Sequence, residues 1–445
     1  MRDPDGATSI ECDRIVRTVT LPSSDHHFLK SDTAKKFAQE GLITDFQINE
    51  NLIISKKIPF VSYPFEWCDS QFFDAGHLTI EIESRAILAG YDLKDSSAWN
   101  IVFEGGFPRF VDLLSFTPLT SHLWHAAGQY GRHFLTPLNI SSQRGLRAHT
   151  AFLIWLDGYP PEVAREILGL SRYLTRQWPL MLGSGRWGNP SERNSTTKYQ
   201  VLQEVTSFRI ALNTALRWML DGVRPRRPKL VKSKGLWTSY RGNRSHYQEN
   251  SLQEKIQIVV KWVAAINPAW VVDLGCNDGE FSDLVAGLGA SVVSIDSDHD
   301  CIEALYQRNK SQQRIYPVIA PLDDLVGGRG WDGEEYRGLI GRLEGNMDLV
   351  LVLALIHHLA VGNSIPLSYI ARTIAKISKK YAIVEFIDPT DLQMKNICAH
   401  HNRNPCDFSV EAQRKAFINA GFTIDGEEKL SGTERYIVLL RKFVA

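Results

Sequence analysis

Residues 271–282 read VVDLGCNDGEFS, an apolar strand that runs directly into a glycine-rich turn and then into the start of a helix. Gly275 and Gly279 permit a tight turn and let a ligand approach the backbone closely. Asp273 ends the strand, where a carboxylate can bind an amine of a ligand or order the loop. The segment therefore predicts a βαβ unit whose first turn binds a nucleotide-type cofactor.

A second acidic residue follows at the end of the next predicted strand. Asp296 ends the run VVSID, about twenty residues after the glycine turn, where a carboxylate can accept both hydroxyls of a ribose. The spacing Gly-x-x-x-Gly differs from the dinucleotide fingerprint Gly-x-Gly-x-x-Gly, and this turn is shorter and carries acids. It suits a ligand without phosphates and with a cationic part, such as S-adenosylmethionine. The alternative is a structural turn that binds no ligand.

Helices and strands alternate around this turn. Apolar residues from Ile256 to Val263 recur at helical spacing and predict an amphipathic helix over residues 252–266. Ser364 is expected to begin a helix and Gly421 to end one. Helical stretches separate the first five strands, which favours a parallel sheet covered on both faces, and the last two strands predict an antiparallel hairpin. The predicted strands are 270–274, 291–296, 315–319, 348–353, 381–386, 423–427 and 435–440.

The motifs DLGCNDGEFS and SIDSD resemble the cofactor-binding motifs of class I S-adenosylmethionine-dependent methyltransferases. MDLVLVLALIHHLA resembles the fourth strand of that family with its following loop, and YAIVEF resembles the fifth strand. The resemblance covers about residues 250–445. It implies an α/β, Rossmann-like fold with a seven-stranded sheet, and S-adenosyl-L-methionine as the cofactor.

A further resemblance spans nearly the whole chain. The segments RDPDG, FVSYPFEWCDSQ, LKDSSAWNIVF, DLLSF, QYGRHFLTPL and ALIHHLAVGN together resemble the nodulation-protein NoeA-type methyltransferases of bacteria. The set is specific because it covers both halves of the chain in order. It does not identify the methyl acceptor.

The resemblance assigns cofactor-binding roles residue by residue. The third strand of the family delivers an acid toward the adenine amine, but this chain has Pro321 there, so Asp323 or a backbone amide is expected to substitute. The structural alternatives are that Asp273 caps the next helix and that Asp296 and Asp323 are only turn residues. The predicted cofactor-binding residues are Asp273, Gly275, Asn277, Asp278, Gly279, Asp296, Ser297, Asp323, Leu353 and Ala354.

Three residues are candidates for chemistry on the acceptor. Methyl transfer from a sulfonium is an in-line displacement, so the protein mainly has to align the acceptor, and it can also remove a proton. His357 and His358 follow the fourth strand at the carboxyl edge of the sheet, and Glu385 ends the fifth strand. Each is a candidate base or acceptor orienter. The alternatives are that a histidine only packs under the loop, and that no base is used.

Cysteine and histidine residues gather between Cys398 and Cys406. Their spacing, C-x-H-H-x-x-x-x-C, fits no common zinc pattern, so no metal site is predicted. A loop that closes over the acceptor is the preferred interpretation of this segment.

The N-terminal half contains a second pattern. Asp95 and Asn100 are five residues apart, and Asp112 follows after two short predicted strands joined by Gly105-Gly106. This resembles the catalytic loop and metal-binding aspartate of protein-kinase-like phosphotransferases. The usual histidine before the first aspartate is absent, since Leu93-Lys94 stand there, and no glycine-rich phosphate loop precedes it. A degenerate kinase-like fold kept for acceptor binding or packing is the preferred interpretation.

These patterns divide the chain into two domains and a linker. Residues 1–223 form an α+β domain for acceptor binding or regulation, residues 224–249 a basic linker, and residues 250–445 the methyltransferase domain. The linker contains RPRRPKLVKSK, with two prolines and six basic residues, which indicates an exposed connection. The alternative is a docking strip for an acidic partner.

Composition excludes several classes of protein. Lys+Arg and Asp+Glu number 50 each, a balance that argues against a dedicated nucleic-acid binder. The longest clean apolar run, residues 349–356, is far too short to span a membrane, and the polar N-terminus does not resemble a signal peptide. Six scattered cysteines fit a reduced compartment. The sequence therefore predicts a cytoplasmic protein.

The function predicted from these observations is S-adenosylmethionine-dependent methyl transfer to an acceptor of unknown class. Two rivals remain open at this stage. One is a non-catalytic binding protein that keeps the methyltransferase fold, and the other is a bifunctional protein with a kinase-like ATP site. The oligomeric state is not predicted.

Overall fold

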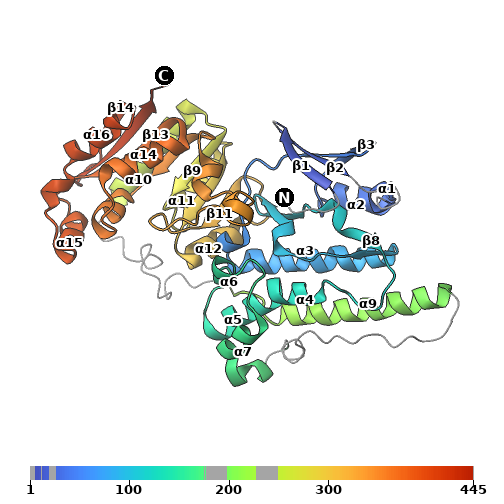
Figure 1. Ribbon diagram of the computed structural model, residues 1–445. Coiled ribbons are helices and arrows are strands. Elements are labelled where there is room, and N and C mark those ends of the chain that lie inside the picture. The colour runs from blue at the N-terminus through green and yellow to red at the C-terminus, as the bar shows by residue number, and fades with distance from the viewer. Residues whose placement is uncertain are drawn as a thin grey trace. The chain divides into compact units, whose positions relative to one another are not determined.

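The chain forms two compact units in a computed structural model (Figure 1). The units comprise Met1–Arg226 and Arg227–Ala445. Residues 227–248 of the predicted linker lie outside the described part of the chain. The described residues are 6–11, 13–19, 27–174, 176, 198–226 and 249–443.

The C-terminal unit contains a seven-stranded sheet in the order β11-β10-β9-β12-β13-β15-β14. The first five strands of this order are parallel, whereas β15 pairs antiparallel with both β13 and β14. The prediction of a seven-stranded sheet that ends in an antiparallel hairpin is therefore confirmed. The strands are β9 (Trp270–Leu274), β10 (Ser291–Asp296), β11 (Ile315–Ile319), β12 (Met347–Val352), β13 (Ser378–Ile387), β14 (Phe422–Lys429) and β15 (Arg435–Lys442).

The central strands are buried on both faces. Every residue of β11 is buried, as are the last five residues of β10. Because successive side chains of a strand point to opposite faces, such strands need helices on both sides of the sheet. The surrounding helices are α10 (Glu249–Ile266), α11 (Glu280–Gly287), α12 (His299–Asn309), α13 (Leu339–Leu343), α14 (Leu367–Ile377), α15 (Leu392–His400) and α16 (Val410–Asn419).

The start of α14 differs from the prediction. Ser364 adopts a left-handed backbone with φ of 58°, and the helix begins at Leu367 with Pro366 as its N-cap. Proline fixes its own φ near helical values but disfavours a helical backbone in the residue before it, here Ile365. The first helical turn therefore forms after Pro366 and does not include Ser364 and Ile365. Gly421, with φ of 94°, lies just beyond the end of α16 as expected.

The N-terminal unit combines small antiparallel sheets with helices. A four-stranded sheet has the order β1-β2-β4-β3, and two further pairs are β5 with β8 and β6 with β7. The hairpin of β6 and β7 places its turn at Gly105-Gly106, as predicted, and its second strand ends at Phe110. The strands are β1 (Gly6–Glu11), β2 (Arg14–Val19), β3 (Phe46–Asn49), β4 (Leu52–Lys56), β5 (Tyr91–Leu93), β6 (Ile101–Glu104), β7 (Phe107–Phe110) and β8 (Phe116–Pro118).

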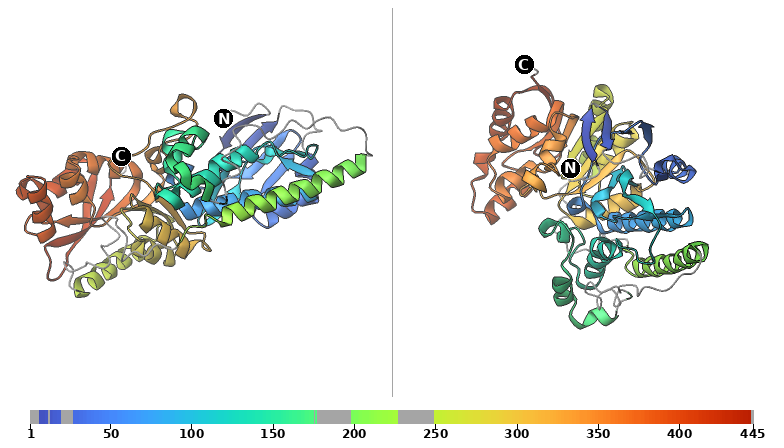
Figure 2. Two further views of the ribbon diagram at one scale, coloured as in Figure 1. Left: turned by 90° about the horizontal axis from the view of Figure 1, so that it is seen from below. Right: turned by 45° about the vertical axis from the view of Figure 1, so that its right-hand side comes forward.

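Two long helices, α3 (Asp69–Leu88) and α9 (Lys198–Asp221), run alongside each other in this unit (Figure 2). Arg209 of α9 is fully buried and forms ion pairs with Glu83 of α3 and with Asp92 of β5. Within the described part of the chain, no helix has both the length and the apolar composition needed to cross a membrane. The shorter helices are α1 (His27–Lys30), α2 (Asp32–Gln39), α4 (Ala127–Tyr130), α5 (Thr136–Arg144), α6 (Thr150–Ile154) and α7 (Pro161–Leu168).

Candidate functional site

A cavity of about 390 Å³ opens at the carboxyl edge of the seven-stranded sheet. Its wall is formed by the loops after β9, β10, β11 and β12 and by α10. Open parallel sheets bind ligands at this edge, and the volume suits a cofactor-sized molecule. The lining residues are Leu252, Lys255, Asp273, Gly275, Cys276, Asn277, Asp278, Glu280, Phe281, Asp296, Ser297, Ala320, Leu322, Asp323, Leu353, Ala354, Leu355, His358, Leu359 and Asn363.

The turn after β9 has a left-handed backbone at three positions, which favours glycine and asparagine there. Gly275, Asn277 and Gly279 have φ values of 72°, 51° and 81°, in the left-handed region. A Cβ on Gly279 would lie 2.4 Å from Cδ1 of Leu305, so glycine is required there by packing as well as by conformation. Gly279 is the N-cap of α11 and does not line the cavity. Its conformation and packing therefore indicate a role in shaping the turn, and its contact with a cofactor stays a prediction.

Two buried carboxylates face the cavity from neighbouring strands. Asp273 accepts a hydrogen bond of 2.7 Å from Oγ of Ser282. Asp296 accepts backbone hydrogen bonds of 2.7 Å from Asn277 and 2.8 Å from Asp298, so it ties its own strand to the glycine turn. Burial is the main cause that raises the pKa of each carboxyl to about 6, and the charge of Asp296 adds to the effect on Asp273. Both carboxylates are therefore in an environment that favours a cationic or hydroxyl-bearing ligand.

The raised pKa of Asp273 gives a testable dependence of stability on pH. The pKa of this carboxyl is about 6 in the folded protein, compared with an ordinary value of 3.8. The proton therefore stabilises the folded state, fully below about pH 4, and this stabilisation is lost as the pH rises to about 6. Asp273→Asn cannot ionise. Its free energy of unfolding, measured by urea titration without ligand, is expected to rise relative to wild type between pH 4 and 7. The relative gain should be at most roughly 3 kcal/mol and should level off above pH 6. A pH-independent difference would contradict the assigned titration.

The loops after β11 and β12 complete the wall. Asp323 lines the cavity and accepts a hydrogen bond from the side-chain amide of Asn363, whereas Pro321 and Asp324 do not line it. The structure thus brings the predicted substitute for the third-strand acid to the wall. Ser297, Leu353 and Ala354 lie on the wall as well, and Ala354 has a left-handed φ of 53°. A non-glycine residue in that conformation stores backbone strain, which often marks functional sites.

The two histidines after β12 have different environments. His358 lines the cavity, while His357 is 4% exposed and lies behind the wall, with the two ring centroids 3.9 Å apart. Burial, with a smaller contribution from Arg435, lowers the pKa of His358 to about 4. At neutral pH its imidazole is neutral and can accept a proton or a hydrogen bond. The structure therefore favours His358 over His357 as the group that meets an acceptor.

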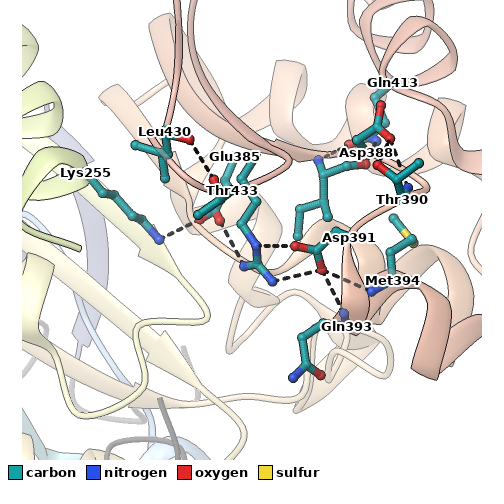
Figure 3. A network of polar contacts seen from close by, with 12 residues as sticks. Lys255, Glu385, Asp388, Thr390, Asp391, Gln393, Met394, Gln413, Leu430 and Thr433 are labelled. Carbon is teal, nitrogen blue, oxygen red and sulfur yellow. Dashed lines mark hydrogen bonds and ion pairs between the residues drawn. The ribbon is translucent and has the colours of Figure 1, made fainter. Parts of the chain in front are cut away.

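Glu385 does not reach the cavity. Strand β13 continues to Ile387, so Glu385 lies inside the sheet rather than at its end, and its side chain is fully buried. Its carboxylate is 2.5 Å from Nζ of Lys255 and 3.1 Å from Nη1 of Arg435 (Figure 3). A group held between two cations and away from the wall is not placed to take a proton from an acceptor. Its candidacy as a base is corrected to a structural ion-pair role.

Sequence reasoning overlooked Lys255, which lines the cavity from α10. A signal for it was present, because Lys255 precedes Val259 and Val263 by four and eight residues and so shares their helix face. All three side chains are buried. A lysine on the apolar face of an amphipathic helix needs a partner or a ligand, since an unpaired buried charge is costly.

The segment between Cys398 and Cys406 is mostly helical, in α15 and in the 3₁₀ turn Pro405–Phe408. Cys398 is buried in a cluster with Val361, Ile387 and Met394. Packing rather than metal binding accounts for this cysteine. The expected loop over the acceptor is corrected to a helix packed on the chain that follows β12.

In the N-terminal unit the two aspartates of the kinase-like pattern have hydrogen-bond partners within the unit. Asp112 is the N-cap of a 3₁₀ turn, accepts a hydrogen bond from Oγ of Ser115, and lies 3.4 Å from Nη1 of Arg17. Asp95 accepts a hydrogen bond of 2.8 Å from the backbone of Ser97. Within the described residues, no group of three or more His, Cys, Asp or Glu side chains is arranged to hold a metal ion. The kinase-like fold stays an interpretation of the sequence.

We expect the full chain to show no magnesium-dependent ATP turnover. Phosphoryl transfer relies on positioning and charge neutralisation, and no glycine-rich loop that could supply them precedes Asp95 in the sequence. A coupled ADP-release assay with wild type tests this, and Asp95→Ala should leave ligand binding in the C-terminal unit unchanged. ATP turnover that disappears in Asp112→Ala would overturn the expectation and favour a bifunctional protein.

Comparison with curated proteins shows a relative of nearly the same extent. The chain is 25% identical over 432 residues to nodulation protein NoeA of Rhizobium meliloti (strain 1021), covering 92% of this chain and 89% of that protein. The resemblance to NoeA-type proteins drawn from the sequence is therefore confirmed. No family model matches the chain.

Two solved structures each match about half of the chain. Magnesium protoporphyrin IX methyltransferase of Synechocystis PCC 6803, solved with bound SAH, is 16% identical with a TM-score of 0.34, over 48% of this chain and 92% of that one. The PH0226 protein of Pyrococcus horikoshii OT3 is also 16% identical with a TM-score of 0.34, over 47% of this chain and 100% of that one.

Proposed function

We propose that the chain is an S-adenosylmethionine-dependent methyltransferase whose C-terminal unit binds the cofactor. The observation that carries the proposal is the pair of buried carboxylates, Asp273 and Asp296, that face one cavity from the ends of β9 and β10. The strand order β11-β10-β9-β12-β13-β15-β14 supports it, because the family resemblance of the sequence implied a seven-stranded sheet with a terminal hairpin.

The residues of the wall fit the groups of this cofactor. Asp296 can accept hydrogen bonds from ribose hydroxyls, since each carboxylate oxygen has two acceptor sites. Asp273 suits the ammonium of the methionine part, and Asp323 suits the adenine amine. Among the described residues that line the cavity, five are acidic and one is a lysine, which disfavours a phosphate-bearing ligand. The fit therefore favours S-adenosylmethionine over a dinucleotide.

When bound, S-adenosylmethionine supplies a methyl group that is already activated on a sulfonium. The chain has to hold an acceptor in line with that methyl and keep water out. His358 is the wall residue that can accept a proton or a hydrogen bond from the acceptor while its imidazole is neutral. The acceptor is unidentified, and labelling cell extracts with enzyme and methyl-labelled cofactor, followed by mass spectrometry, is the experiment that would identify it.

Asp296→Ala is expected to weaken the binding of S-adenosylhomocysteine at least about tenfold, measured by titration calorimetry. The variant loses charge-assisted hydrogen bonds to the ribose, each worth roughly 1.5–3 kcal/mol. Asp324→Ala is the control, because Asp324 is an exposed acid near the cavity that does not line it. If Asp296→Ala keeps the circular dichroism spectrum of wild type and binds equally well, Asp296 is not part of the site. Binding by wild type without any methyl transfer would support the non-catalytic alternative.

A further inference from the structure

The outward side of helix α9 is apolar although it is exposed. The helix forms a border of the N-terminal unit (Figure 1), and its inner side packs on α3. On the other side Phe208, Ile210 and Trp218 are 51%, 38% and 52% exposed. A surface helix normally turns charged and polar side chains toward water. Clustered exposed apolar side chains are instead typical of an interaction site.

In the described part of α9, the outward side has no charged residue between Glu204 and Asp221. The two arginines of that stretch, Arg209 and Arg217, pair with glutamates of α3. The exposed residues that remain are uncharged, and we call them the outer face of α9. They are Ser207, Phe208, Ile210, Ala211, Thr214, Ala215 and Trp218.

The middle of the outer face consists of small side chains. Thr214 donates its hydroxyl to the helix backbone at 2.8 Å, so this group is satisfied within the helix. Its neighbours Ala211 and Ala215 are smaller still, which lets the backbone of another helix approach closely. At one end, the indole of Trp218 stays half exposed although Arg176 lies 4.6 Å over its ring. The face therefore has a low middle between larger side chains.

This pattern is complementary to itself when two copies of the helix run antiparallel. A two-fold axis at the level of Asn213 places Ala211 opposite Ala215 of the partner subunit. The same axis places Phe208 opposite Trp218 of the partner subunit, so aromatic side chains meet at both ends. In such an interface each copy uses the same patch, and a pattern that is symmetric about one position is what this requires.

Electrostatics also permits this pairing. Because the outer face is uncharged, two copies meet without like-charge repulsion across the axis. In the antiparallel arrangement, the positive N-terminal end of each helix dipole lies beside the negative C-terminal end of the other. A partner of different chemistry would find no charge on this face to recognise, so a second copy of the chain fits it best.

We propose that the outer face of α9 pairs antiparallel with the same face of a second copy, so that the chain forms a two-fold dimer through its N-terminal unit. The proposal goes beyond the proposed function and does not depend on cofactor binding. A single pair of helices is a small interface, so the dissociation constant should be roughly 1–100 µM.

Sedimentation equilibrium on the full chain, from about 1 to about 300 µM, tests the dimer. Wild type should shift from the mass of one chain toward twice that mass. Trp218→Glu and Ala215→Glu each place two carboxylates across the interface, and each should weaken the dimer at least about thirtyfold. Leu170→Glu is the matched control, because Leu170 is 82% exposed in the same unit but is not on α9. Circular dichroism checks that each variant is folded.

Cysteine cross-linking tests the antiparallel register separately. Thr214 lies one residue from the proposed axis, so the two copies of Thr214→Cys should form a disulfide when oxidised with copper–phenanthroline. Ser207 lies six residues from the axis, which separates its two copies by roughly 18 Å along the helices. A disulfide needs Cα atoms within about 7 Å, so Ser207→Cys should give no cross-link above the background of oxidised wild type.

Three outcomes would overturn the proposal. Wild type that stays monomeric at the highest concentration would show that no second copy covers this face. A dimer that persists in both glutamate variants would place the interface elsewhere. Equal cross-linking of Ser207→Cys and Thr214→Cys would exclude the antiparallel pairing. None of these outcomes bears on the proposed function, which is tested by cofactor binding in the C-terminal unit.

Discussion

His358→Ala is expected to lower the rate of methyl transfer roughly a hundredfold, while the affinity for S-adenosylhomocysteine changes less than about twofold. Among the described residues that line the cavity, His358 is the only histidine. Burial and the charge of Arg435 lower its pKa to about 4, so it is a neutral but weak base at pH 7. A weak base places the effect at the lower end of the range for general base catalysis.

The measurement is transfer of labelled methyl groups to extract, with cofactor affinity determined separately by calorimetry. His357→Ala is the matched control, because His357 is the preceding residue but is buried behind the wall. We expect His357→Ala to lower the melting temperature. The protein that remains folded should lose less of its rate of methyl transfer. Unchanged turnover in His358→Ala would show that alignment of the acceptor with the methyl group suffices. A large loss of cofactor affinity would show that His358 contacts the cofactor.

The C-terminal unit was predictable because its strands are short apolar runs between polar turns. Strands β9, β10 and β11 have the predicted limits, since each is buried on both faces; β9 ends at the glycine turn, β10 at Asp296 and β11 shortly before Pro321. In the N-terminal sheet this signal was weaker. Strand β3 alternates half-buried and exposed residues, and such short strands carry too few apolar residues to be recognised.

The candidate site was predictable where chain order alone determines position. Residues that follow parallel strands must meet at one edge, which is why Asp273, Asp296 and Asp323 were placed near a common cavity. Other placements depend on how elements rotate and dock. His358 begins a π-helical turn, His358–Gly362, and it is this histidine of the adjacent pair that lines the cavity. The spacing of Lys255 to Val259 and Val263 indicates that it lies on the buried face of α10, but only the docking of the helix brings it to the cavity wall.

Arg435→Met is expected to lower the free energy of unfolding by about 3 kcal/mol, the lower end of the range for breaking a buried ion pair. Arg435 is 1% exposed and bridges Glu385 and Asp391. Its loss removes one of the two cations, Lys255 and Arg435, that pair with Glu385. It also removes the bidentate partner of Asp391, which caps α15. The melting temperature of the C-terminal unit should fall by roughly 6–12 °C, measured by calorimetry.

The control for this variant is Arg441→Met on the same strand. Arg441 pairs with Asp425 at 3.0 Å, but its side chain is 55% exposed, so its loss should cost at most about 1 kcal/mol of unfolding free energy.

A second measurement separates the electrostatic effect of Arg435 from its effect on packing. Without Arg435, the pKa of His358 should rise toward its ordinary value, because that cation helps to lower it. The acidic limb of the pH profile of methyl transfer should then shift to higher pH in Arg435→Met and stay in place in Arg441→Met. Equal stability of the two variants would mean that the buried network contributes no more than a surface ion pair, and an unshifted profile would show that burial alone determines the titration of His358.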